Sequence, residues 1–330
     1  MEPTPAAEDW RPGRINAKPV RHPWRWVMIA VLAVLVLMLL NLLIFNPAYN
    51  WPFVFQAMNQ TPVIRGFWIG TILVTVLAML FGVLGGVVLA VMRLSDNPVF
   101  RAVSAGYTWF FRAIPRYVLL VTLGALGILF PTGIALGVPF DWKIIEWLGL
   151  SGDWRFLTLD ANQVFTGFFG AVIGLAASEA AYMAEIARAG ILSVDRGQVE
   201  AGRALGMNNR QSMIRIVLPQ ALRIIVPPTG NETTAMLKDT SLLIGIPLIN
   251  EMFFQLRSIG SRTYQVFPVM VSATLYYLAA SSVLMVVQYF IERRLGRGYG
   301  STSKAAAQQA SAAQSTGVQS TGAQSTGADQ

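Results

Sequence analysis

Long hydrophobic runs separated by short polar segments dominate this chain. Each run could form a helix that crosses the hydrocarbon core of a bilayer, which is about 30 Å thick and needs roughly 20 helical residues. The pattern predicts an all-α membrane protein with about six transmembrane helices. The six predicted spans are 24–45, 66–92, 113–137, 164–190, 221–246 and 267–291.

Small residues recur four positions apart in two of these runs. Gly82, Gly86 and Ala90 do so in the second run, and Gly170 and Gly174 in the fourth. Small side chains on one face let helix backbones approach closely in lipid. The spans are therefore expected to pack as a bundle.

The composition agrees with a membrane protein. Hydrophobic residues make up 54% of the chain and charged residues 13%, a balance that would leave large apolar patches outside a soluble domain. The chain has no cysteine and one histidine, which excludes disulfides, thiolate metal sites and clusters of imidazole ligands. Neither a metal site nor a catalytic residue is predicted.

The net charge of +8 comes from basic residues that lie beside the hydrophobic runs. Nineteen of the 25 Lys and Arg residues fall on one predicted side, in the two terminal flanks and in residues 93–116 and 188–223. Basic residues concentrate on the cytoplasmic side of membrane proteins, so both termini are predicted to be cytoplasmic. We interpret the charge as a topology signal of a multi-pass cell-membrane protein, with no nucleic-acid partner.

Three segments lie outside the spans. Residues 1–23 are predicted to be a cytoplasmic N-terminal segment. Residues 296–330, with a repeated QSTG, are too polar to form a core and are predicted to be a disordered cytoplasmic tail. The external stretch 138–161 contains three tryptophans and predicts a short helix on the membrane surface or on the bundle, or a contact for a partner.

The polar segment between the fourth and fifth runs predicts two short helices around a glycine. Asp195 with Gln198 three residues later is a start of the capping-box type, and Gly206 can end the first helix in the left-handed conformation. Asn209 can cap a second helix that ends before Pro219.

This predicted pair of helices suits insertion into a groove of a soluble partner. An amphipathic linker at the membrane surface is the alternative interpretation. The apolar residues available for contact are Ala201, Ala204, Leu205 and Met207, and the polar ones are Glu200, Arg203 and Arg210.

Ionisable residues within a span are expensive in lipid and mark candidate substrate paths. The fifth run contains Glu232, Lys238 and Asp239. On a helix Glu232 and Asp239 share a face and Lys238 lies about 100° away. The two acids could hold the ammonium of an amino acid and Lys238 could attract its carboxylate; alternatively, Lys238 forms a salt bridge to a neighbouring span. The complete set of path candidates is Asn231, Glu232, Lys238, Asp239, Thr240 and Ser241.

Two further features concern the ends of the spans. Glu185 and Arg188, three residues apart, are expected to form an ion pair with a structural or gating role. Pro227 and Pro228 interrupt helical hydrogen bonding and predict a kink or a hinge.

Several motifs resemble those of one family. EAGRALG at 200–206 is followed, nine residues after its last glycine, by IVLP, a spacing that resembles the coupling loop of ABC importer permeases. Five further motifs are similar to those of polar-amino-acid permeases. They are EIARAGILSV, LPQALR followed by a proline pair, GN, KDTSL and FRAIP. The resemblance covers about residues 60–295 and implies the helical bundle of a type I (MetI-like) importer permease.

The resemblance implies a domain organisation and a set of partners. Residues 24–45 would be an additional transmembrane helix, and 60–295 the permease domain with its coupling loop at 191–219. The partners would be ABC ATPase subunits, an extracytoplasmic amino-acid-binding protein, a second permease subunit and membrane lipid. The residues that would dock the ATPase are Glu200, Ala201, Gly202, Arg203, Leu205, Gly206 and Pro219.

The chain has no GxxxxGK[ST] element, so it is not expected to bind ATP or to act as an enzyme. ATP and magnesium would belong to the partner subunit. Two departures from the family are notable: Gly202 replaces a common alanine, which predicts a looser docking helix, and Arg116 replaces a hydrophobic residue.

Two other classes of protein share some of these features. An ion-driven secondary transporter could use intramembrane acids as ion sites, but it would be expected to show an internal repeat, which we do not find. A membrane scaffold or receptor could use the loop to recruit a signalling protein. The sequence does not specify which amino acid would be carried, nor whether the pore is a homodimer or a heterodimer.

Overall fold

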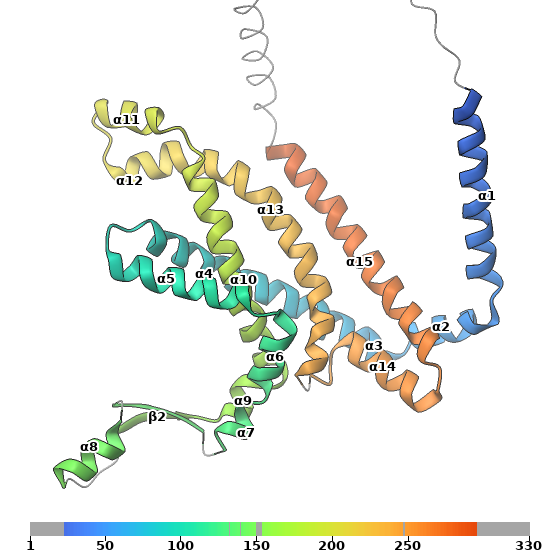
Figure 1. Ribbon diagram of the computed structural model, residues 1–330, viewed down its shortest axis with the longest axis horizontal. Coiled ribbons are helices and arrows are strands. Elements are labelled where there is room, and N and C mark those ends of the chain that lie inside the picture. Colours follow the sequence, from blue (N-terminus) through green and yellow to red (C-terminus); the bar gives the residue numbers. More distant parts are fainter. Residues whose placement is uncertain (1–22, 132, 139, 150–153, 247, 296–330) are drawn as a thin grey trace, which may run out of the picture. The chain divides into compact units, whose positions relative to one another are not determined.

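The computed structural model describes residues 23–131, 133–138, 140–149, 154–246 and 248–295 (Figure 1). The predicted N-terminal segment, apart from its last residue, and the whole of the predicted C-terminal tail lie outside the described residues. The chain divides into two compact units, residues 1–50 and residues 51–330.

The first unit contains one long apolar helix. α1 (Pro23–Phe45) has no buried residue, and a short 3-10 helix, η1 (Pro47–Tyr49), follows it. The Asn46 side chain accepts a hydrogen bond from the Ala48 N–H and starts η1. The predicted helix at 24–45 is confirmed as a helix of spanning length and hydrophobicity.

The second unit contains the remaining helices and a two-stranded sheet. Its elements are α2 (Trp51–Met58), α3 (Thr61–Gly66), η2 (Phe67–Leu73), α4 (Val74–Leu94), α5 (Pro98–Ala113), α6 (Arg116–Gly124), α7 (Leu126–Leu129), β1 (Ile134–Gly137), α8 (Asp141–Leu148), β2 (Arg155–Leu159), α9 (Ala161–Phe165), α10 (Gly167–Leu192), α11 (Arg196–Ala204), α12 (Asn209–Ser212), η3 (Met213–Val217), α13 (Leu218–Asp239), η4 (Thr240–Gly245), α14 (Met252–Thr263) and α15 (Val266–Leu295).

Four helices among the described residues are long and apolar enough to cross a membrane. They are α1, the continuous helix at 61–94, α10 and α15, which agree with four of the six predicted spans. The number rises to five if the bent pair of α5 with α6 and α7 forms one span.

The predicted span at 113–137 is not one continuous helix. Ile114 is extended and Pro115 has no N–H to donate, so the helix breaks there and its two parts meet at 98°. Pro131 and Gly133 then end the apolar segment, and β1 begins at Ile134. These turn residues outweigh the hydrophobicity of the run.

The predicted fifth span is a helix but a polar one. α13 is long enough to span, at about 33 Å by its 1.5 Å rise per residue, yet it is not among the helices apolar enough to face lipid. Its polar side chains meet other helices, as described below.

The most extensive helix packing joins α4 and α10. A Cβ on Gly82 would lie 2.6 Å from Glu179 Cγ, and one on Gly86 would lie 2.5 Å from Met183 Cβ. The prediction that small residues permit close packing is confirmed here. Gly174 does the same against Leu120 of α6.

Two larger hydrophobic cores and two smaller ones hold the second unit together. The first joins α4, α6, α10, α13 and η4 through residues such as Ala78, Leu120 and Leu175. The second joins α2, α3, α14 and α15 through residues such as Leu256 and Val269. α13 also contacts α15, and η4 contacts α14, so both lie beside the second core as well. The polar residues of α13 therefore lie next to several neighbours.

A β-ribbon carrying a short helix interrupts the chain between α7 and α9. β1 pairs with β2 in antiparallel register, with Ile134 opposite Leu159, and α8 lies between the strands. The predicted helix in this stretch is confirmed, whereas the strands were not predicted. In Figure 1 the ribbon projects from the helices of the second unit at the end opposite to α11 and α12.

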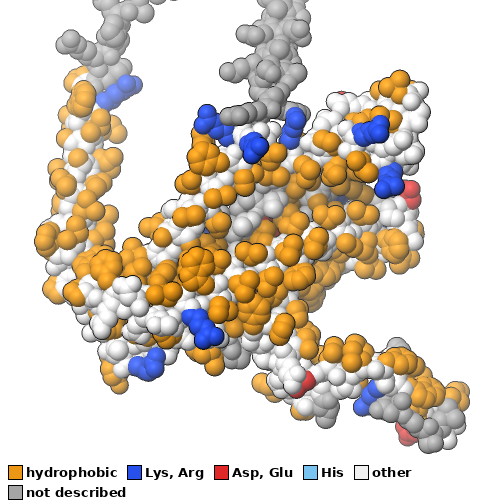
Figure 2. Space-filling view, turned by 180° about the vertical axis from the view of Figure 1, so that it is seen from behind, with side chains coloured by type: hydrophobic (Ala, Val, Ile, Leu, Met, Phe, Trp, Pro, Cys, Tyr) orange, Lys and Arg blue, Asp and Glu red, His pale blue; other side chains and the backbone are white. Residues whose placement is uncertain are grey.

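Figure 2 shows hydrophobic side chains over most of the visible face of the second unit. Exposed apolar residues include Val76, Leu80 and Val91 of α4. Basic side chains gather at the end where α15 terminates and where α11 and α12 lie, and a few appear at the opposite end. An apolar belt with charged ends is typical of a bundle that lies in lipid.

Gly86→Ala tests the close approach of α4 and α10. The added methyl would lie 2.5 Å from Met183 Cβ and 3.0 Å from the Ala184 nitrogen, so a backbone must shift. We expect a loss of about 1–3 kcal/mol in stability, typical of overpacking, measured by thermal unfolding in detergent. Gly106→Ala, whose methyl would meet no atom within 4 Å, is the control and should not lower stability. Equal effects of both variants would contradict the packing argument.

Candidate functional site

One arginine joins three helices through ion pairs. Arg116, the first residue of α6, places Nη1 2.5 Å from Oδ2 of Asp239 on α13 and Nη2 2.9 Å from Oε2 of Glu179 on α10. The same Nη2 lies 3.6 Å from Oε2 of Glu232. A planar guanidinium with several donors suits such shared contacts. We call Arg116, Glu179, Glu232 and Asp239 the arginine cluster.

The local structure of each helix positions the members of this cluster. The extended Ile114 and Pro115 separate α5 from α6, so Arg116 stands directly after the break. Glu232 and Asp239 both reach Arg116 from α13, which confirms that they share a helix face. The ring of Tyr182, one turn after Glu179 on α10, lies 4.8 Å from Arg116 Cζ and adds a cation–π contact.

The cluster is mostly buried and carries an excess of acid. Glu179 is fully buried, and its Oε1 has no hydrogen-bond partner in the described part of the protein. The side chains of Glu232 and Asp239 keep 26% and 28% of their area exposed. Three carboxylates around one guanidinium leave unbalanced negative charge if all are ionised, and its exposed part can attract a cation.

Lys238 lies outside this cluster, on a different face of α13. It lines a cavity of about 550 Å³ together with residues of η4, α14 and the first half of α15. No ion pair joins Lys238 to any residue that the structure describes, so the predicted alternative of a salt bridge to another span is not observed there. Arg116 contacts Glu232 and Asp239, whereas Lys238 lines this cavity, so the structure does not bring the acids and Lys238 together.

The remaining path candidates bond within the protein. Thr240 is buried and donates to the Leu237 carbonyl, and Ser241 donates to the Lys238 carbonyl. Asn231 accepts a hydrogen bond from Gln288 of α15 at 3.0 Å. Asn231 is thus tied to α15 and apart from the arginine cluster.

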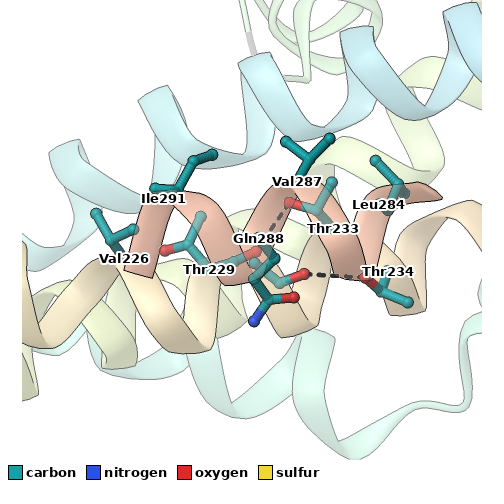
Figure 3. A pocket seen from close by; sticks show the side chains of 9 residues that line it. Val226, Thr229, Thr233, Thr234, Leu284, Val287, Gln288 and Ile291 are labelled. Carbon is teal, nitrogen blue, oxygen red and sulfur yellow. Dashed lines mark hydrogen bonds between the residues drawn. The ribbon is translucent and has the colours of Figure 1, made fainter. Parts of the chain in front are cut away.

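A second cavity, of about 210 Å³, lies between α13 and α15 (Figure 3). Its threonines point their hydroxyls back to the helix: Thr229, Thr233 and Thr234 each donate to the carbonyl four residues earlier. Gln288 is likewise engaged, with Asn231 and with Glu292. Apolar side chains form most of the rest of the lining, so this cavity offers few free polar groups to a ligand.

The segment after α10 forms the predicted pair of short helices around a glycine. Asp195 caps α11 by accepting from the Gly197 N–H, and Gly206 follows with φ +84°. Gln198 does not complete a capping box, because its side chain bonds with Gln220. The second cap is Asn208 instead of the predicted Asn209, and Gln211 completes a capping box there.

The second short helix does not end before Pro219, contrary to the prediction. α12, the π-helix η3 and α13 follow one another without a break, and Pro219 lies in the first turn of α13. Pro219 has no N–H to donate within this continuous run, and the π-turn directly before it shifts the bonding register. α13 also continues through Pro227 and Pro228, so these residues do not end the helix.

The predicted looseness of α11 at Gly202 is not supported by the packing. Gly202 is buried, and a Cβ there would lie 2.7 Å from Ile216 Cδ1 and 3.3 Å from Met207 Sδ. The absence of a side chain lets α11 pack closely on η3. Val194, Val217 and Ala221 form a small core beneath it.

Most of the predicted docking residues are exposed on the side of α11 and α12 that faces away from this small core. Leu205 is 84% exposed, although it is apolar. Arg203 donates to the Asn209 side chain and closes the turn between the two helices. Glu200, Ala201, Arg203 and Gly206 are also exposed, whereas Gly202 is buried and Pro219 is exposed in the first turn of α13.

The predicted ion pair at the end of α10 is present. Arg188 and Glu185 contact each other at 2.9 Å within the helix. Both side chains remain partly exposed. A pair of this kind within one helix contributes little to stability.

The sequence matches the family described as "Binding-protein-dependent transport system inner membrane component" over residues 82–297. The chain belongs to this family. The "Arginine transport system permease protein ArgU" of Corynebacterium glutamicum is 40% identical over 310 residues, which cover 92% of this chain and 90% of that protein. The "L-cystine transport system permease protein TcyB" of Bacillus subtilis is 34% identical, covering 76% of this chain and 93% of that protein.

Solved structures agree with this family. The crystal structure of "an amino acid ABC transporter with histidines" contains a chain that matches with a TM-score of 0.53 and 28% identity. The match covers 71% of this chain and 94% of that chain. The protein is thus an inner membrane component of a transport system with the permease fold, and the resemblance found in the sequence is confirmed.

Sequence reasoning about this inner membrane component missed the arginine cluster as a unit. Arg116 was noticed only as a departure from the family, and it was assigned to a cytoplasmic flank; in the structure it is mostly buried among α6, α10 and α13. A charge in a position where a hydrophobic residue is usual was the available signal. Glu251 was also missed: it is fully buried and accepts from Thr71, Tyr277 and the Phe254 N–H.

Arg116→Met tests the energetic role of the arginine cluster. The substitution would leave a buried Glu179 and a partly buried Asp239 without a cation. Breaking a buried ion pair typically costs about 3–5 kcal/mol in the free energy of unfolding, and we expect a loss near the lower end of this range. Thermal unfolding in detergent measures this loss. Adding Glu179→Gln should restore part of it by removing the unpaired buried charge.

Arg112→Met is the matched control for this experiment. Arg112 also approaches the Tyr182 ring, at 5.5 Å, but it is exposed. The control should change stability by less than about 1 kcal/mol, as exposed charges do. Equal losses from both arginines would contradict a special role of the cluster.

Proposed function

We propose that this protein is the permease subunit of an ATP-driven importer of amino acids, working with a second permease subunit. Two curated relatives that together span most of the chain are named for transport of arginine and L-cystine, and this supports an amino acid as the cargo. An extracytoplasmic binding protein delivers the amino acid, and separate ATPase subunits supply the energy.

The observation that carries the proposal is the exposed pair α11–α12 with Leu205 at its tip. Its underside is fixed by Gly202 against Ile216 and by the core around Val217, while Leu205 is left uncovered. A rigid projection with an apolar tip suits a groove in a soluble partner. α11, α12 and the turn between them lie within the coupling loop at 191–219, and we assign this loop to the ATPase.

Movement of the coupling loop has a direct mechanical route into the bundle. α12, η3 and α13 form one uninterrupted run of helix from Asn209 to Asp239. Asp239, at the far end of this run, is held by Arg116 to α6 and, through Glu179, to α10. A tilt of the loop would therefore be transmitted to the arginine cluster. Partner binding changes access only if its contacts differ between the two states of the bundle.

The proposed topology places the coupling loop and both termini in the cytoplasm and the ribbon with α8 outside the cell. The distribution of basic residues supports this orientation. ATP and magnesium bind to the partner ATPase. Secondary transport is the competing function, and ATP-dependent uptake in vesicles that hold no ion gradient would exclude it.

Leu205→Asp tests the docking surface. The residue is 84% exposed, so folding should be unaffected, whereas a charge in the centre of the contact should remove about 2 kcal/mol or more of binding free energy, about thirtyfold in Kd. Co-purification of the ATPase and ATP-driven uptake report the loss. Leu148→Asp, at an exposed apolar residue of α8, is the control and should retain the ATPase. Full ATPase retention by Leu205→Asp would refute the docking assignment.

The sequence contains no cysteine, and this permits a direct test of orientation. In cells, Leu205→Cys should react with a membrane-impermeant maleimide only after the membrane is opened, whereas Leu148→Cys should react in intact cells. Labelling of residue 205 from outside would reverse the proposed topology and remove the basis for ATPase docking.

A further inference from the structure

Two contacts, one helical turn apart, join α11 of the coupling loop to the helix that continues from it. At the first contact, Gly202 of α11 lies so close to η3 that a Cβ there would be 2.7 Å from Ile216 Cδ1. At the second contact, Nε2 of Gln220 on α13 donates a hydrogen bond of 2.6 Å to Oε1 of Gln198 on α11. Gln198 and Gly202 are four residues apart, and so are Ile216 and Gln220. α11 therefore runs antiparallel to η3 and the start of α13, with both contacts on one face of each helix.

The second contact fixes the direction of α11 relative to α13. A single contact at Gly202 would let α11 turn about that point. The small core beneath α11, which includes Val199 and Val217, does not prevent such a turn by itself, because hydrophobic contact is non-directional. A hydrogen bond requires a defined distance and angle. In the part of the chain that the structure describes, the bond between Gln198 and Gln220 is the side-chain hydrogen bond that joins α11 to α13.

Gln220 lies where the backbone of this helical run is least regular. The π-helix η3 ends at Val217, and Pro219 supplies no N–H to the turn that follows. Nε2 of Gln220 also donates to the Ile216 carbonyl in this segment, at 3.0 Å. Both hydrogens of one half-buried amide are thus used, one within the irregular turn and one across to Gln198.

We propose that Gln198 and Gln220 are positioning residues for energy coupling. Their bond holds α11 at a fixed angle to α13, so a displacement of the coupling loop by the ATPase moves α13 as well as α11. Without the bond, α11 turns on its apolar base and part of each displacement does not reach the bundle. The inference rests on the proposed function, and the role does not require either residue to touch ATP, the cargo or the ATPase. Leu205 stays exposed for docking in either case.

The test measures the amount of amino acid taken up per ATP hydrolysed. The full-length chain is purified with its partner subunits, placed in proteoliposomes with the binding protein, and supplied with a mixture of radiolabelled L-amino acids as the probe. Gln220→Leu and Gln198→Leu should each lower this ratio about two- to tenfold, as expected for loss of one net hydrogen bond, while the ATPase still co-purifies. Gln56→Leu, at an exposed glutamine of α2, is the control and should leave the ratio unchanged.

A charge exchange tests whether the link itself matters. Gln198→Glu combined with Gln220→Lys should restore the ratio to near the wild-type value, because an ion pair replaces the amide bond. Gln198→Glu combined with Gln220→Glu should keep the ratio low, because the two charges repel each other. An unchanged ratio in Gln220→Leu, no recovery with the ion pair, or a loss of ATPase retention in parallel with uptake would each overturn the inference. ATP-driven uptake by the wild type in the same vesicles would show that the proposed function survives such a failure.

Discussion

The ion pairs of Arg116 are the interaction on which the arrangement of the second unit depends. One guanidinium contacts Glu179 of α10 and Asp239 of α13, residues 63 and 123 positions away in the chain. Moving charges out of water is costly, and only well-placed partners offset that cost. The contacts therefore require α6 to begin where α10 and α13 both pass, and the break at Pro115 places Arg116 at that point.

Close backbone packing makes this arrangement possible. Gly82 on α4 faces Glu179 directly, at a distance that excludes any side chain, so α4 covers the carboxylate and removes it from solvent. The same helix pair is drawn together at Gly86. The close packing against α4 and the ion pair with Arg116 thus both fix the position of α10. Because protein interiors are densely packed, a shift of one neighbour must be accommodated by the others.

α13 connects the features that bear on transport. Its first turn continues from the helices of the coupling loop, its middle is bound to α15 through Asn231 and Gln288, and its end carries Asp239 and Lys238 on different faces. An acidic site and a basic cavity are therefore separated by the width of one helix. Such a helix can respond to a partner at one end and to a charged ligand at the other, provided that each binds one state of the bundle better.

The sequence by itself determined four long apolar helices, the glycine-centred pair of short helices after α10, the shared face of Glu232 and Asp239, and the family. Each of these depends on periodicity, capping residues or motifs within a short stretch of chain. Tertiary structure alone decided that Arg116 occupies the acids of α13, that Lys238 faces a different cavity, and that Gly202 is needed for packing against Ile216. Helical periodicity shows which residues share a face, but the neighbour that meets this face is chosen by the packing of helices distant in the chain.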